Sequence, residues 1–323
     1  MLRSVVTGVG GYLPTEVVTN DDLAKVVDTS DEWIRERTGI RRRYRAPEGV
    51  STSDLAVEAA KQALQRAGRS PSEIDLIVVA TTTADLTFPA VATMVQRKLG
   101  CPVGIAFDVQ AVCSGFVYAL AVVDGFVARG QAKCALVIGA ETMTRLMDWT
   151  DRGTCVLFGD GAGAVVVEPG EGQGTPADRG LLGFSLRADG AKQDLLYVDG
   201  GPSSTGTVGK LRMQGNQVFR HAVVNISEAI LLAAKAAGVE VADIDWFIPH
   251  QANQRILEGV ARRVGIDEKR VISTVADHAN TSAASIPLAW AEGVADGRIK
   301  PGDLLLIEAM GGGLTWGAAV IRL

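Results

Sequence analysis

The chain has 323 residues; 47% are hydrophobic, 5% are aromatic and 37 are glycine. This length allows one large domain or two packed ones, and the composition is typical of compact α/β enzymes. The net charge of −5 argues against a nucleic-acid-binding protein. The four cysteines form no CxxC pair and show no ligand spacing with histidine, which argues against disulfides and a metal site.

The first 14 residues, "MLRSVVTGVGGYLP", have the pattern of a strand and a turn rather than of a signal peptide. No apolar run reaches the length of a transmembrane helix, so we expect a soluble, cytoplasmic protein without membrane contacts. The longest basic run follows at Arg41-Arg42-Arg43-Tyr44-Arg45. Two interpretations remain open for it: a solvated face, or a docking site for an acidic partner or phosphates.

The next clear elements are an alanine-rich helix that ends at Gly68 and an apolar strand at 76–79. A second strand, "VGIAFDV", leads to Cys113 in "AVCSGF", and a helical apolar pattern follows. Cys113 is therefore placed at a strand-to-helix turn, where helix N–H groups stabilise a thiolate. A core cysteine remains the alternative there, whereas Cys134, beside the strand "ALVIG", fits a core position directly.

The segment 168–180, "EPGEGQGTPADRG", is the one stretch with linker composition. Beyond it, an alanine-rich helix leads into the strand "DWFIPH", which ends at His250. The carboxyl end of a buried strand in an α/β fold is where ligands bind, although a lone histidine is more often structural. Asn280 in "DHANTSAAS" is a good helix N-cap by its residue type, and His278 is expected in a loop.

The strand "DLLLIEAM" is followed by "GGGLTWG" at 311–317. Consecutive glycines let backbone N–H groups approach a substrate closely. A phosphate loop would need a Lys-Ser or Lys-Thr pair that is missing here, so an oxyanion hole is the other interpretation.

The chain contains an internal repeat. The segment 59–80 resembles 229–250, 125–141 resembles 293–309, and 161–167 resembles 316–322. Cys113 and Asn280 start corresponding helices, whereas His250 corresponds to Ala80, so packing alone does not call for histidine there. Near-continuous apolar strands need helices on both faces. We therefore predict two pseudo-symmetric halves, residues 1–172 and 173–323, around a central helical layer, with clefts where their loops meet.

Six motifs together resemble the β-ketoacyl-[acyl-carrier-protein] synthase III family over essentially the whole chain. They are "DTSDEWIRERTGIRRR", "AVCSGF", "DRGTCVLFGDGAGA", "PHQANQRI", "HANTSAAS" and "GGGLTWG". The departures are Val112 where alanine is common, Ala279 where glycine is frequent and Leu314 where phenylalanine is frequent; none removes a chemical group. The resemblance implies the thiolase-like five-layered αβαβα fold, α/β in class, with duplicated pseudo-twofold halves.

The resemblance also implies a homodimer that condenses an acyl-CoA primer, expected to be acetyl-CoA, with malonyl-acyl carrier protein (ACP). Cys113 would carry the acyl group, with the N–H groups of Cys113 and Gly312 as the oxyanion hole. His250 and Asn280 would donate hydrogen bonds to the malonyl thioester carbonyl as carbon dioxide leaves. No metal or other cofactor is implied, because CoA thioester and malonyl-ACP are substrates.

The resemblance further assigns binding residues. The CoA tunnel would be lined by Thr29, Trp33, Arg37, Arg152, Gly215, Asn216, Phe219, Ala252 and Asn253, with the adenine between Trp33 and Arg152. The ACP surface would comprise Arg220, Gln251, Arg255, Arg262 and Arg263, although a solvated helix face explains the last two equally well. The acyl pocket would comprise Phe88, reaching across the dimer, with Leu146 and Phe158.

Other function classes fit the sequence less well. A papain-like hydrolase has the same Cys, His, Asn order, and the 137 residues from Cys113 to His250 fit it, but "AVCSGF" and the internal repeat do not. Elongating synthases have histidine where Asn280 stands, and thiolases have a cysteine near the C-terminal glycines. A non-catalytic scaffold would be expected to have lost one of the three polar residues. The nearest alternative is a condensing enzyme of secondary metabolism with an unusual acyl starter.

Overall fold

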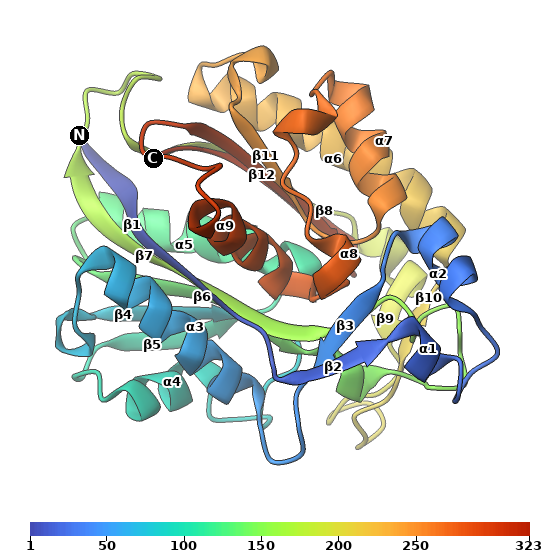
Figure 1. Cartoon of the computed structure of the whole chain (residues 1–323). Helices are drawn as coiled ribbons and strands as arrows, with labels where there is room; N and C mark the ends of the chain where they lie inside the picture. Colours follow the sequence, from blue (N-terminus) through green and yellow to red (C-terminus); the bar gives the residue numbers. More distant parts are fainter.

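Two β-sheets form the frame of the molecule, and helices lie on both faces of each (Figure 1). The computed structural model describes all 323 residues. The first sheet has the strand order β1-β7-β6-β4-β5. Its strands are β1 (Leu2–Tyr12), β4 (Leu76–Ala80), β5 (Ile105–Val109), β6 (Ala135–Thr142) and β7 (Asp160–Glu171). Strand β5 pairs only with β4 and leaves one edge of this sheet open.

The second sheet repeats this order as β8-β13-β12-β11, without a counterpart of β5. Its strands are β8 (Gly180–Ala188), β11 (Trp246–Pro249), β12 (Leu304–Gly311) and β13 (Thr315–Arg322). In the first sheet β5, β4 and β6 are parallel, and in the second sheet β11 and β12 are parallel. The next two strands, β7 and β1 in the first sheet and β13 and β8 in the second, each pair antiparallel with the strand before them. Strands β4, β6 and β12 are buried along their whole length, as expected for strands covered on both faces.

The helices complete five layers. Helices α3 (Thr52–Ala67) and α4 (Val91–Leu99) cover the outer face of the first sheet, and α6 (Gly215–Ala237) covers that of the second, with α7 (Gln254–Val264) beside it. Helices α5 (Gly115–Ala128) and α9 (Ser285–Ala295) lie between the sheets (Figure 1). The 30 buried residues of the largest apolar cluster come from both sheets and this central layer. The predicted thiolase-like fold is confirmed.

Glycines in the strands allow the layers to approach closely. A Cβ on Gly10 would lie 2.2 Å from the Ala59 carbonyl oxygen of α3, and one on Gly139 would lie 2.2 Å from that of Ala283. Neither distance is sterically possible. The second contact matters for the site, because it presses the segment before α9 directly against β6.

Smaller elements surround one end of the two sheets. They are β2 (Glu16–Thr19), α1 (Asn20–Leu23), α2 (Asp31–Thr38), β3 (Arg42–Arg45), β9 (Leu196–Val198), β10 (Leu211–Met213) and α8 (Val275–His278). Single 3-10 turns also occur, of which η2 (Val112–Ser114) and η7 (Ser282–Ala284) belong to the site. Helix α2 lies against α7.

Two expectations on local structure are corrected. Strand β7 continues to Glu171, so the connection between the sheets is shorter than the predicted linker at 168–180. The basic run is neither a solvated face nor a docking site as a whole. Arg43 is fully buried and donates to the Asn20 side chain and the Val156 carbonyl, while Arg41 and Arg42 pair with Asp277.

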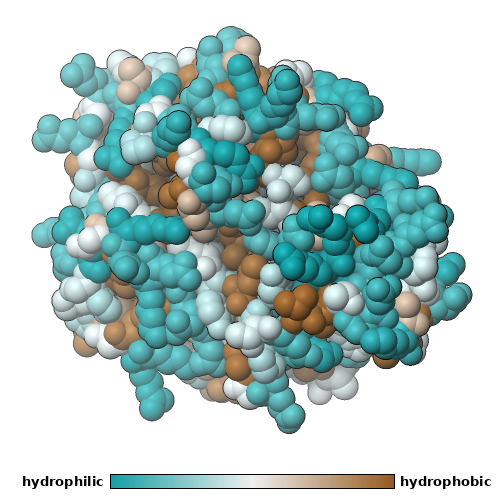
Figure 2. Space-filling model, viewed as in Figure 1, coloured by the Kyte–Doolittle hydropathy of each residue, from teal (hydrophilic) through white to brown (hydrophobic).

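Figure 2 shows a face on which hydrophilic residues predominate and hydrophobic residues appear in separate spots. None of the helices combines the length and the apolar character needed to cross a bilayer.

Candidate active site

A cavity of about 530 Å³ opens between α2, α6 and α7 and reaches the junction of the two sheets. Cys113, His250 and Asn280 all line it. They come from three places in the chain: the turn after β5, the end of β11 and the segment before η7. All three are buried, with exposed fractions of 4%, 4% and 6%. The structure thus brings the three predicted residues together.

Cys113 lies on η2, directly before α5. The sequence places it at a helix N-terminus, which favours the thiolate. In the folded chain burial is the largest effect; together with a lowering by the Ser282 hydroxyl and a raising by the Glu141 charge, it raises the pKa of the Cys113 thiol to about 12. The free protein therefore holds Cys113 as a thiol, which needs a proton acceptor before it can attack.

The backbone around these residues is strained. Only three non-glycine residues have positive φ: Val112 at 49°, Ala279 at 58° and Ser282 at 51°. Val112 directly precedes Cys113, Ala279 directly precedes Asn280, and Ser282 follows Asn280 by two residues. Positive φ is unusual for a β-branched residue, and such outliers concentrate at functional sites. Val112 and Ala279 are also two of the departures from the family pattern, and the glycine that is frequent at 279 would adopt this conformation without strain.

His250 follows β11, and its side chain is fixed by α9. Its Nδ1 lies 2.6 Å from the Ser285 hydroxyl, which also accepts a hydrogen bond from the Gln251 N–H. Burial lowers the pKa of His250 to about 3, so the ring is neutral at neutral pH. When the Ser285 hydroxyl donates to Nδ1, the ring proton is on Nε2, and this nitrogen is then a hydrogen-bond donor.

The Asn280 amide has a defined orientation. Its Oδ1 accepts a hydrogen bond from the Ser282 N–H at 2.9 Å, which leaves the Nδ2 donor for the cavity. Its backbone bonds to Leu157 and Gly159 on both sides, which ties the segment to the loop before β7. Asn280 is not the N-cap expected from its residue type, because Thr281 precedes η7 and Ala284 precedes α9. Its bond from the Ser282 N–H orients the amide instead.

The glycine loop lies behind Cys113. A Cβ on Gly311 would lie 2.6 Å from the Cys113 nitrogen, so this glycine allows the loop to pack on the nucleophile turn. The Gly312 N–H is buried and donates no hydrogen bond within the chain. A buried free N–H beside the cysteine turn is the kind of donor that an oxyanion hole requires. Gly312 lines a second, neighbouring cavity rather than the one that contains Cys113.

Glu308 is a functional candidate that the sequence analysis missed. It lines the cavity from β12, is 1% exposed, and its Oε2 has no hydrogen-bond partner. Burial raises the pKa of this carboxyl to about 8, so it is mostly protonated at pH 7. An acidic residue inside the otherwise apolar run "DLLLIEAM" was the available signal.

Replacement of Glu308 by glutamine is expected to stabilise the protein most at alkaline pH. The folded-state pKa of about 8 lies above the ordinary value of 4.5, so the folded chain binds more protons between these values. The contribution of Glu308 to the free energy of unfolding is therefore fully present below pH 4.5 and is lost as the pH rises through 8. Melting temperatures of both proteins at pH 5, 7 and 9 test this. An equal pH dependence would contradict the prediction.

The outer part of the cavity contains most of the predicted CoA residues. Those in its lining are Trp33, Arg37, Gly215, Asn216, Phe219, Ala252 and Asn253. Thr29 and Arg152 are outside the lining. The Arg152 guanidinium lies 5.0 Å from the centre of the Trp33 ring and bonds to the Asp28 carbonyl. An adenine ring does not fit between them at this distance, so Arg152 has to move for the predicted stacking.

The predicted carrier-protein residues divide into two groups. Arg220 on α6 and Arg255, Arg262 and Arg263 on α7 are exposed. Gln251 is fully buried, donates to the Pro249 and Ile272 carbonyls, and accepts from the N–H groups of Thr274 and Val275. With its amide fully engaged inside the chain, Gln251 cannot contact another protein, so this assignment is corrected.

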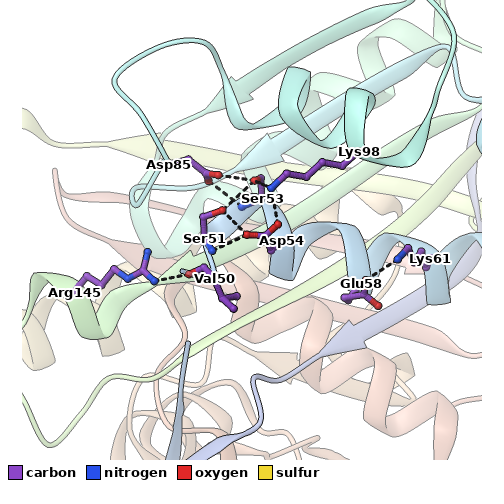
Figure 3. Close-up of polar contacts among 9 residues, drawn as sticks. All are labelled: Val50, Ser51, Ser53, Asp54, Glu58, Lys61, Asp85, Lys98 and Arg145. Atoms are coloured by element: carbon purple, nitrogen blue, oxygen red, sulfur yellow. Dashed lines mark hydrogen bonds and ion pairs between the residues drawn. The ribbon is translucent and has the colours of Figure 1, made fainter. Parts of the chain in front are cut away.

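The three predicted acyl-pocket residues do not meet within one chain. Phe158 lines the cavity with Cys113, Leu146 lines the second cavity, and Phe88 is 82% exposed. The loop that carries Phe88 is nevertheless anchored. Asp85 accepts hydrogen bonds from the Ser53 N–H and hydroxyl, and Lys98 of α4 donates to the same hydroxyl (Figure 3). An exposed phenylalanine on a held loop is available for contact with another chain.

Three further polar residues support the site: Ser285 behind His250, Ser282 beside Cys113, and Glu141 at the end of β6. The first two lie within "HANTSAAS", but their contacts depend on which segments fold together.

The duplicated five-layered fold, with a buried cysteine, a neutral histidine and an asparagine donor in one cavity, defines the class of protein. It is a condensing enzyme, an acyltransferase of the thiolase superfamily. Models of 3-oxoacyl-[acyl-carrier-protein (ACP)] synthase III match residues 107–190 and, for the C-terminal region of that family, residues 234–323.

Individual relatives agree over the full length. A β-ketoacyl-[acyl-carrier-protein] synthase III from Caulobacter vibrioides is 79% identical and covers 100% of both chains. The crystal structure of 3-oxoacyl-[acyl-carrier-protein] synthase III from Aquifex aeolicus has a TM-score of 0.93 and 45% identity, over 99% of this chain and 100% of that one. The priming β-ketosynthase of the R1128 polyketide pathway has a TM-score of 0.93 but 35% identity, over 99% and 96%. The chain belongs to the β-ketoacyl-[acyl-carrier-protein] synthase III family.

Proposed function

We propose that the protein condenses an acyl-CoA primer, expected to be acetyl-CoA, with malonyl-ACP to give 3-oxoacyl-ACP, CoA and CO2, and so initiates fatty-acid synthesis. The observation that carries this proposal is the convergence of Cys113, His250 and Asn280 in one cavity that opens at the predicted CoA residues. The 79% identical relative is named for the same synthase activity, which supports it.

In the first half-reaction, Cys113 attacks the thioester carbonyl of the primer and becomes acylated as CoA leaves. The N–H groups of Cys113 and Gly312 stabilise the oxyanion. Support for this role comes from the unpaired Gly312 N–H and from the close packing of Gly311 on the Cys113 nitrogen. The reaction needs no metal or redox cofactor, because both substrates already carry activated thioesters.

In the second half-reaction, malonyl-ACP loses carbon dioxide, and its thioester oxygen gains negative charge as the enolate forms. His250 Nε2–H and Asn280 Nδ2–H donate to this oxygen. The supporting geometry is that the other polar atom of each side chain already has a hydrogen-bond partner. His250 Nδ1 bonds to the Ser285 hydroxyl, and Asn280 Oδ1 accepts from the Ser282 N–H. Donors that are oriented in advance stabilise developing charge without reorganisation. The enolate carbon then attacks the acyl group on Cys113.

The outer cavity holds CoA in this proposal, with Trp33 and Arg37 at its mouth. The Arg37 guanidinium lies 4.6 Å from the centre of the Trp33 ring. The adenine stacks on Trp33 after Arg152 has moved aside. Arg255 lines the cavity, and the exposed Arg220, Arg262 and Arg263 lie on the same two helices, α6 and α7. These arginines attract the acidic carrier protein by charge, despite the net charge of −5.

A homodimer is part of the proposal. Strand β5 is an open edge of the first sheet and carries the exposed Ile105. Exposed apolar side chains also occur just before β5, at Val103, and in the loop after β4, at Leu86 and Phe88. In a dimer, Phe88 of one protomer enters the acyl pocket of its partner and limits the primer, together with Leu146 and Phe158. We place the two thiolase-like halves at 1–172 and 173–323, and the enzyme in the cytoplasm, where acyl-CoA and carrier protein are found.

Reconstitution with purified malonyl-ACP and a panel of acyl-CoA primers tests the proposed function. We expect acetoacetyl-ACP from acetyl-CoA, detected by intact mass of the carrier protein, and lower rates with longer primers. Malonyl-ACP alone and acyl-ACP primers serve as controls. Product from an unusual starter only would favour a condensing enzyme of secondary metabolism, and no product from any primer would reject the proposal.

A further inference from the structure

A buried polar pair, Ser282 and Glu141, lies near Cys113 but outside the lining of the cavity. Ser282 lies on η7, which packs against the η2 turn that carries Cys113. The Ser282 hydroxyl donates to the Glu141 carboxylate, with 3.0 Å between Ser282 Oγ and Glu141 Oε1. Both Ser282 and Glu141 are fully buried. Neither side chain has a part in the two half-reactions proposed above for Cys113, His250 and Asn280.

Glu141 is held by several donors. The hydroxyls of Thr81, Thr82 and Thr83 and the Thr82 N–H all bond to its carboxylate. Even with these donors, burial raises the pKa of Glu141, so this carboxylate takes up a proton more readily than an exposed one. The carboxylate is thus fixed in position and remains a competent base.

Ser282 is placed by a strained backbone, with φ of 51°. Its N–H donates to Asn280 Oδ1, its hydroxyl donates to Glu141, and η7 holds it against the turn of Cys113. Persistent strain at a buried serine needs an explanation. A hydroxyl that accepts from the thiol while it donates to the carboxylate supplies one, because it links the nucleophile to a base that does not touch it.

We propose that Ser282 and Glu141 form a proton relay that deprotonates Cys113 during acylation. The thiol proton moves to Ser282 Oγ while the Ser282 proton moves to Glu141 Oε1, and the thiolate sulfur forms its bond to the acyl carbon. The bond to the CoA sulfur breaks, and CoA leaves as a thiolate that takes a proton from water. When condensation releases Cys113 as a thiolate, the same path returns the proton from Glu141.

Other ionisable groups surround this path. His250 and Glu308 line the cavity with Cys113, and Arg37 and Arg255 lie further out in its lining. Asp160 on β7 is buried beside the end of β6 and bonds to Ala46 and Thr144, not to Ser282. When the Ser285 hydroxyl donates to His250 Nδ1, His250 Nε2 already carries the ring proton, so neither ring nitrogen is free to accept the thiol proton.

The test compares the acidity of the thiol with its acylation in Glu141→Gln and Ser282→Ala, with Asp160→Asn as the matched buried-carboxylate control. Iodoacetamide labelling of Cys113 against pH reports the thiol pKa without any substrate. Acetylation by acetyl-CoA alone, followed by intact mass in a single turnover, reports the relay. Melting temperatures report folding. The mechanism rests on the proposed function, but the labelling arm remains informative even if acetyl-CoA is not a primer.

For Glu141→Gln we expect the thiol to titrate at lower pH, because a nearby negative charge is removed, and yet acetylation to slow by about 10²-fold. For Ser282→Ala, which keeps the N–H that holds Asn280, we expect titration at higher pH and a similar loss. Asp160→Asn should lower the melting temperature about as much as the other two variants do. It should change neither the rate of thiol labelling nor the rate of acetylation by more than about threefold. Acetylation that simply follows the thiolate fraction in Glu141→Gln, or an equal loss in Asp160→Asn, would overturn the relay.

Discussion

Replacement of Cys113 by alanine is expected to abolish acyl transfer, with a loss of at least about 10³-fold in synthase activity. The reason is geometric as well as chemical: Cys113 is the one cysteine in the lining of the catalytic cavity. Incubation with acetyl-CoA followed by intact-mass analysis measures the effect. The native chain should gain one acetyl group, and Cys113→Ala should gain none.

Cys134→Ala is the matched control for this experiment. The Cys134 thiol is also buried, and burial raises its pKa to about 12, but it packs in the outer core between α3 and the first sheet. Its replacement should leave the acetyl adduct intact and cost about 1 kcal/mol of stability or less. An adduct that persists in Cys113→Ala would show that the nucleophile is elsewhere.

Loss of either hydrogen-bond donor to the malonyl thioester is expected to block condensation after Cys113 has been acylated. His250→Ala and Asn280→Ala should each lower condensation by about 10²–10³-fold, the usual effect of removing one oxyanion donor. Acetylation of Cys113 should persist, so the acyl-enzyme should accumulate. Intact mass of the enzyme and release of CO2 from malonyl-ACP, followed together, separate the two half-reactions.

Two further variants distinguish donation from folding. Asn280→Asp keeps an oxygen for the Ser282 N–H but removes the donor, so we expect the fold to hold and condensation to fall at least as far. Ser285→Ala removes the hydroxyl that orients His250 Nδ1 and should give a smaller loss than His250→Ala. If both half-reactions failed equally in every variant, His250 and Asn280 would not be donors specific to the malonyl step.

Local sequence features already pointed to the reactive positions. Cys113 at a strand-to-helix turn, His250 at the end of an apolar strand and the glycines at 311–313 are all defined by their immediate neighbours. The repeat also predicted the two sheets, because strand and helix periodicities follow from side-chain spacing along the chain. The structure agrees on all of these positions.

Local sequence features did not predict which polar residues of the chain are buried or how burial shifts their pKa. The helix N-terminus at Cys113 suggested a stabilised thiolate, but complete burial raises its pKa to about 12. Gln251 is polar and lies next to His250, so a surface role was reasonable, but four internal hydrogen bonds hold it in the core. Arg43 is likewise buried, within a basic run for which the sequence left a solvated face and a docking site open. Burial depends on which other segments cover a residue.

The sequence by itself determined the family, the duplicated fold and the three polar residues of the cavity, since motifs and periodicity are local properties. The tertiary structure alone decided how those residues are held and charged. Ser282 and Glu141 are 141 positions apart and meet only because the segment before α9 packs on β6. Contacts across such separations, and the desolvation that accompanies them, arise from the packing of layers and leave no local pattern in the chain.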